Sequence, residues 1–77
     1  MFFQIIWDEE DDLLGNVQHI AEHGLTVDEV EAVLNDPQSE DFSQSSNRPC
    51  CFGYTPGGEY IIVIYEEVDN AAYPITA

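Results

Sequence analysis

Residues 60–65 read YIIVIY, an unbroken run of apolar and aromatic side chains. A strand that shows one face to water alternates apolar and polar residues, whereas a run without alternation is typical of a strand covered on both faces. We therefore predict that this run forms the central strand of a sheet. A chain of 77 residues has room for one such sheet, so we expect a single domain over residues 1–77.

Turn signals flank the central strand on both sides. The residues PGG precede it and VDN follows it, with the first turn centred on residues 54–59. Residues of these types favour tight hairpin turns. We therefore expect the central strand to pair antiparallel with strands formed by RPCCFGYT at 48–55 and AAYPITA at 71–77.

Two helical patterns lie between residues 16 and 37. Apolar side chains at positions 17, 20 and 21 form one stripe, and Gly24 is placed to end that first helix. The second helix carries a capping box, with Thr26 as the N-cap residue and Glu29 three positions later. Asp36-Pro37 ends it, because the residue before a proline avoids helical geometry.

The remaining segments complete an α+β fold. FFQIIW at residues 2–7 predicts a first strand, and a short extra strand is expected near 41–45. The predicted architecture places two short N-terminal helices on one face of a four- to five-stranded antiparallel sheet, in the order β-α-α-β-β-β.

The charge of the chain restricts its partners. Sixteen Asp and Glu residues stand against one basic residue, Arg48, for a formal net charge of −15. Nucleic-acid affinity comes largely from Lys and Arg that displace counterions, so unaided binding to DNA or RNA is disfavoured. The apolar runs are too short to span a membrane and no basic segment precedes one, so we expect a cytoplasmic protein without membrane contact. We predict no cofactor.

Two motifs suggest chemistry that their surroundings do not support. HIAEHG matches the H-x-x-E-H pattern of some zinc hydrolases through His19, Glu22 and His23. A catalytic zinc site also needs a third protein ligand, and the helix ends one residue later, so we predict no such site. Weak surface binding of added zinc or nickel by His19 and His23 stays open. Adjacent Cys50 and Cys51 point to opposite faces of a strand, so we expect free thiols.

Taken in order, the motifs resemble the BrnT-type toxins within the wider RelE/ParE-like superfamily. The resemblance covers roughly residues 4–77. It is carried by Trp7-Asp8, His23-Gly24, Asp36-Pro37, Arg48, Gly53, IIVIYEE and YPITA. It implies a small bacterial toxin fold, RNA cleavage as the family activity and an antitoxin as partner.

The basic residues of the family are mostly missing. Glu22 stands where the family typically has Lys before His-Gly, and the family's basic segment after the last strand has no counterpart in residues 1–77. We therefore predict a toxin-fold protein that acts mainly through protein association, with an antitoxin-like partner or with itself, and with ribonuclease activity reduced or lost. The alternative is an active RNA endonuclease with His23, Arg48 and His19 as catalytic residues. A weak metal-binding protein is the third hypothesis.

The role of Arg48 has its own alternative. A single guanidinium in so acidic a chain is expected to pair with a carboxylate, and Asp8, Glu66 and Glu67 are the candidates. Such an ion pair competes directly with a phosphate contact.

Overall fold

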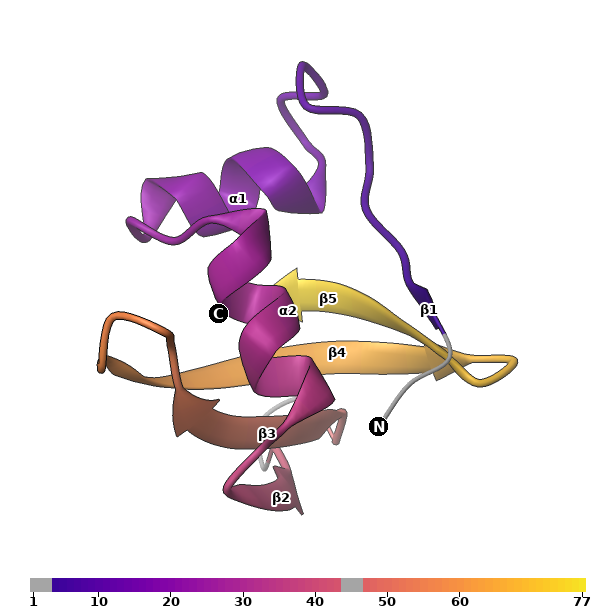
Figure 1. Ribbon diagram of the computed structural model, residues 1–77. Coiled ribbons are helices and arrows are strands. Elements are labelled where there is room, and N and C mark those ends of the chain that lie inside the picture. Colours follow the sequence, from indigo (N-terminus) through magenta and orange to yellow (C-terminus); the bar gives the residue numbers. More distant parts are fainter. Residues whose placement is uncertain (1–3, 44–46) are drawn as a thin grey trace.

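The computed structural model describes residues 4–43 and 47–77, and it shows two helices packed over a five-stranded sheet (Figure 1). The sheet order is β1-β5-β4-β3-β2. The predicted α+β class is confirmed, and the YIIVIY run lies in the central strand β4 as expected. The elements, in chain order, are β1 (Gln4–Ile5), α1 (Asn16–Glu22), α2 (Val27–Asn35), β2 (Ser39–Phe42), β3 (Pro49–Tyr54), β4 (Tyr60–Val68) and β5 (Ala71–Thr76).

The prediction of a purely antiparallel sheet is wrong, because β1 runs parallel to β5. Strands β2 to β5 are antiparallel neighbours, joined in sequence by short connections. Strand β1 instead enters the sheet beside the last strand, after which the chain passes through both helices. A local pattern predicts hairpins, but it holds no information about a pairing between opposite ends of the chain.

Two strand boundaries also differ from the prediction. The first strand was expected over residues 2–7 but covers only Gln4–Ile5, and residues 1–3 lie outside the described part. The short extra strand near 41–45 is present as β2 at Ser39–Phe42, slightly earlier than expected, and residues 44 and 45 of that prediction lie outside the described ranges.

The turn that joins α1 to α2 has the expected hydrogen bonds on both of its sides. The amide of Leu25 donates to Ile20 O at 3.0 Å and that of Gly24 to Ala21 O at 2.9 Å, which is the Schellman arrangement. Gly24 has φ of +79°, a backbone angle that side chains disfavour. In the next turn the Thr26 hydroxyl accepts from the Glu29 amide, and the Glu29 carboxylate accepts from the Thr26 amide. The predicted capping box is therefore confirmed.

The two hairpins around β4 have different turns. In the first, the Thr55 amide donates to Glu59 O at 2.8 Å. In the second, Asp69 and Asn70 both have positive φ, at 48° and 68°. Two consecutive positive angles are typical of the type I′ turn, whose twist matches that of the flanking strands.

The core lies between the helices and one face of the sheet. On the sheet side, Cys51 pairs with Val63, and both are at most 1% exposed. The helices contribute Ile20, Val30, Val33 and Leu34 to the same cluster. Gly53 allows α2 to pack close to β3, since a Cβ at Gly53 would lie 3.3 Å from Val33 Cγ1. Cys50 and Cys51 are both free thiols and both buried, as expected.

Candidate functional site

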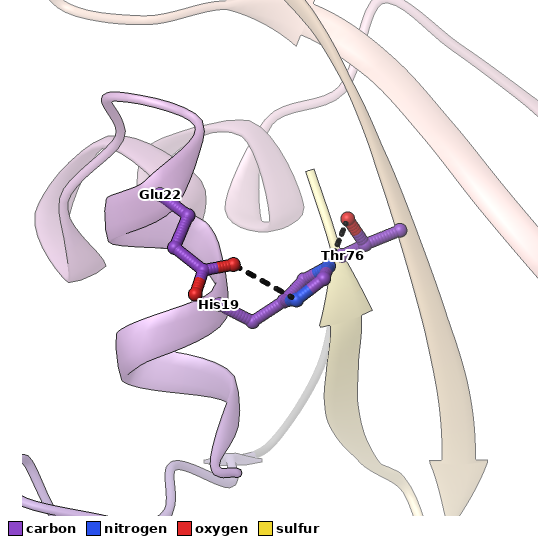
Figure 2. A network of polar contacts seen from close by, with 3 residues as sticks. All are labelled: His19, Glu22 and Thr76. Atoms are coloured by element: carbon purple, nitrogen blue, oxygen red, sulfur yellow. Dashed lines mark hydrogen bonds and ion pairs between the residues drawn. The ribbon is translucent and has the colours of Figure 1, made fainter. Parts of the chain in front are cut away.

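The two histidines lie together at the end of α1. His19 is inside the helix, His23 is its C-cap residue, and their ring centroids are 5.1 Å apart. Figure 2 shows the imidazole of His19 between Glu22 and Thr76. Its Nε2 shares a hydrogen bond of 3.0 Å with Thr76 Oγ1, and its Nδ1 lies 3.9 Å from Glu22 Oε2. The ring therefore links α1 to the end of β5.

Arg48 has a different partner. Its Nε donates to Glu66 Oε1 at 3.0 Å, and the two side chains are 41% and 48% exposed. The predicted ion pair is confirmed, with Glu66 as the carboxylate. Because Val63 and Tyr65 of β4 point into the core, the alternation of the strand directs Glu66 to the face opposite the helices.

The structure does not bring the three predicted catalytic residues together. Within residues 4–43 and 47–77, no hydrogen bond, ion pair or ring contact joins Arg48 to His19 or His23. The histidines belong to the first helix, whereas the guanidinium is engaged across the sheet with Glu66. A phosphate at Arg48 would lie beside the Glu66 carboxylate, which repels it and offsets the charge of the guanidinium.

A more extensive polar network connects Asp8, Asn16 and Tyr73. The Asn16 amide and the Tyr73 hydroxyl donate to Asp8 Oδ2 at 2.9 and 2.6 Å, while the Asp8 amide donates to Asn16 Oδ1 at 2.9 Å. The Nδ2 of Asn16 donates to Ile6 O at 3.1 Å and to Pro74 O at 2.9 Å. The side chain of Asn16, which is 4% exposed, thereby joins the first loop, the start of α1 and β5.

The network shifts the acidity of its two titratable groups in opposite directions. The Tyr73 hydroxyl and then the Asn16 amide lower the pKa of Asp8 from its usual 3.8, because both stabilise the carboxylate. The same hydrogen bond, followed by partial burial, raises the pKa of Tyr73 to about 12. Tyr73 therefore keeps its proton at neutral pH and donates a hydrogen bond to Asp8, so it is poorly suited to act as a general acid.

Two surface depressions are relevant to phosphate binding. One, of about 260 Å³, lies between α1 and β5 and includes His19, Asn16 and Tyr73 in its lining. The other, of about 750 Å³, is open and strongly acidic; its lining consists of Glu40, Asp41, Phe42, Pro49, Tyr65 and Glu67. Neither lining includes a Lys or Arg, so neither provides the positive charge that a phosphate would need.

In the described ranges, no group of three or more His, Cys, Asp or Glu side chains is arranged to hold a metal ion. Binding of added zinc or nickel by the histidine pair stays a prediction. Neither of the helices described is long and apolar enough to cross a membrane.

Sequence reasoning identified individual residues better than their arrangement. It included Glu66 among three candidate partners of Arg48, but it did not find the roles of Asn16 and Tyr73. Asn16 stands at the start of a helix, where a polar side chain usually caps the backbone. Its bond to Pro74, at the other end of the chain, has no local signal. A search for relatives gives no further assignment: no protein-family model, no curated protein and no solved structure matches this chain.

Proposed function

We propose that this protein acts mainly by associating with a protein partner, as a BrnT/RelE-like toxin-fold protein does in a toxin–antitoxin-like module, and that ribonuclease activity is reduced or lost. The observation that carries the proposal is the state of Arg48. It is the one Lys or Arg in the sequence, and Glu66 neutralises it at a distance of 3.0 Å.

Electrostatics argue against RNA cleavage. Attack by a 2′-hydroxyl needs a base, an acid and cationic groups that stabilise extra negative charge on the phosphorus centre. His19 or His23 could transfer protons. The cationic part is missing, because the single guanidinium is paired and sixteen carboxylates repel the polyanion.

Exposed apolar surface supports association. Tyr54, Tyr60 and Val68 are 58%, 54% and 47% exposed, although all three lie in the strands that form the centre of the sheet. Exposed apolar side chains that gather on one face commonly mark a contact with another macromolecule.

The test has an enzymatic arm and an association arm. We expect no cleavage and no retention of a single-stranded oligoribonucleotide at about 0.15 M salt. The proposal is overturned if the parent protein cleaves RNA and the Arg48→Ala and His23→Ala variants do not. In the association arm, light scattering coupled to size-exclusion chromatography measures self-association. Affinity capture from the native host, followed by cross-linking, identifies a direct partner. A monomer that cross-links to no partner contradicts the proposal.

A further inference from the structure

The face of the sheet opposite the helices carries a cluster of aromatic and apolar side chains. In the pairing of β3 with β4, Cys51 and Val63 point into the core, so the neighbouring pairs point to the other face. Figure 1 shows both helices on the core side. We call this surface the aromatic face; it consists of Phe52, Tyr54, Tyr60 and Ile62, of which the last three are 58%, 54% and 39% exposed.

The rings of the aromatic face are already arranged by contacts with one another. Phe52 and Tyr60 stack with ring centroids 6.4 Å apart and an interplanar angle of 14°. Tyr54 meets Tyr60 at 4.9 Å and 60°, edge to face. Because these rings are in contact with one another before binding, they would lose little additional side-chain entropy when a partner binds.

Charge decides which kind of partner fits. Asp41 of β2 lies across from Cys50 on this side of the sheet, and the alternation of β4 directs Glu66 to the same side. Burial and then the Asp41 carboxylate raise the pKa of the Cys50 thiol, which is consistent with that placement. The one guanidinium of the chain is paired with Glu66. With a net charge of −15, the chain attracts a partner with positive charge to this face and repels an acidic one.

A second copy of the chain fits poorly. It would bring another net charge of −15 to the contact. The outer strand β2 is also unsuited to edge pairing, because its four residues, Ser39–Phe42, are all exposed and include two acids. In addition, the Phe42 amide donates to its neighbour Asp41 Oδ1 at 2.8 Å, which occupies one backbone donor of that strand.

We propose that the aromatic face docks a cationic protein segment, with Arg or Lys side chains over Tyr54 and Tyr60 and an apolar side chain against Phe52 and Ile62. Cations bind the faces of aromatic rings, and Arg does so most often. Tyrosine and arginine are also the residues that most often dominate the affinity of protein interfaces. This inference rests on the proposed association function and names the partner's chemistry.

The probe is a synthetic 16-residue amphipathic peptide of Arg and Leu, titrated into the full chain at about 0.15 M NaCl with fluorescence anisotropy as readout. A scrambled peptide of equal charge without an apolar stripe controls for general attraction to the acidic chain. We expect Tyr60→Ala to weaken binding of the amphipathic peptide about tenfold, and Tyr54→Ala to weaken it severalfold. The scrambled peptide should bind more weakly, with no dependence on either tyrosine.

Matched variants separate the aromatic face from other exposed apolar residues. Leu14→Ala removes a side chain that is 97% exposed and lies outside this face, and it should change the affinity less than about twofold. Phe42→Ala removes an aromatic ring that is 64% exposed and lines the acidic depression instead. Tyr60→Phe keeps the ring and should retain most of the affinity, which would assign the loss in Tyr60→Ala to the ring rather than the hydroxyl. Urea unfolding of Tyr60→Ala shows whether that variant is folded.

Failure of this inference can be told apart from failure of the proposed function. If a captured partner binds Tyr60→Ala and Tyr54→Ala as well as the parent, or if Phe42→Ala alone weakens binding, the surface assignment is wrong and association stands. If the chain dimerises through the aromatic face, the cationic partner is wrong. If the parent binds neither the probe nor any partner and stays monomeric, both proposals fall.

Discussion

The two faces of the sheet are built from alternate residues of the same strands, yet they meet very different surroundings. On the helix side, Val63 and Ala72 are 0% exposed. On the other side, Tyr54 and Tyr60 are more than half exposed. The apolar run of β4 predicted a central strand covered on one side by the helices, and the described helices do lie on one face. The comparison shows that apolar residues of one strand are fully buried on the helix side and partly exposed on the other.

The strongest test of the difference between the two faces is to replace one side chain on each face by alanine. Leu34→Ala, on the helix side and 0% exposed, should lower the free energy of unfolding by about 3 kcal/mol, because it leaves a cavity in the core. Ile62→Ala, 39% exposed on the aromatic face, should cost about 1 kcal/mol or less. Urea unfolding measures both. Equal losses of stability would mean that the aromatic face is covered in the free protein.

The next largest effect concerns the attachment of the first loop to the helix side. Asn16→Ala removes three side-chain hydrogen bonds, the two to Ile6 O and Pro74 O and the one accepted from the Asp8 amide, so we expect a loss of about 2–3 kcal/mol. Gln18→Ala removes an exposed hydrogen bond to Glu10 O and should cost less than about 0.5 kcal/mol. A small effect of the Asn16 change would show that the loop is held by other contacts.

A smaller effect should appear in the pH dependence of stability. The folded state lowers the pKa of Asp8, so its contribution is present above the usual value of 3.8 and is lost as the pH falls through the folded pKa. It raises the pKa of Tyr73 from 10.0 to about 12, so that contribution is present below pH 10 and is lost as the pH rises toward 12. Tyr73→Phe should therefore be less stable than the parent near neutral pH, and the difference should shrink at both extremes.

Urea unfolding of the parent and of Tyr73→Phe across this range measures the difference. A gap that stays constant through both ends would mean that the hydrogen bond between Tyr73 and Asp8 does not couple to either titration. An NMR titration of the Asp8 carboxylate gives an independent reading, since its pKa should rise in the variant.

The smallest effect should come from salt, which acts on the carboxylates around both faces. At a net charge of −15, raising NaCl to about 0.15 M shortens the Debye length to about 8 Å and relieves self-repulsion. We expect Tm to rise by roughly 2–5 °C. A Tm that does not change with salt would show that the carboxylates do not repel one another appreciably in the folded chain.

Local features of the fold were predictable from the sequence, and distant pairings were not. The capping box of Thr26 and Glu29 needs only residues within one helical turn, so its pattern was sufficient. The pairing of Arg48 also followed from composition, because one guanidinium among many carboxylates will find a partner. The parallel contact of β1 with β5 and the hydrogen bond from Asn16 to Pro74 join opposite ends of the chain. They depend on the finished fold.

The candidate site shows the same limit. His19 and His23 were expected to lie together because they are four residues apart in one helix, and they do. Their position relative to Arg48 depends on which face of the sheet each element covers. The sequence separation of His19, His23 and Arg48 does not show this. The aromatic face could not be predicted for a related reason. A strand that is apolar on both faces has the same sequence pattern whether a helix of the same chain or another molecule covers it.

The pairing of Gln4 with Ala71 has a consequence for how the protein is made. Ribosomes add about 5–20 residues per second, so the first strand emerges seconds before the last one exists. During that interval β1 has no edge to join, so the parallel pair can form only after β5 has been synthesised. A nascent chain stalled before residue 71 should therefore leave Gln4–Ile5 accessible to proteases, whereas the chain that contains β5 protects them.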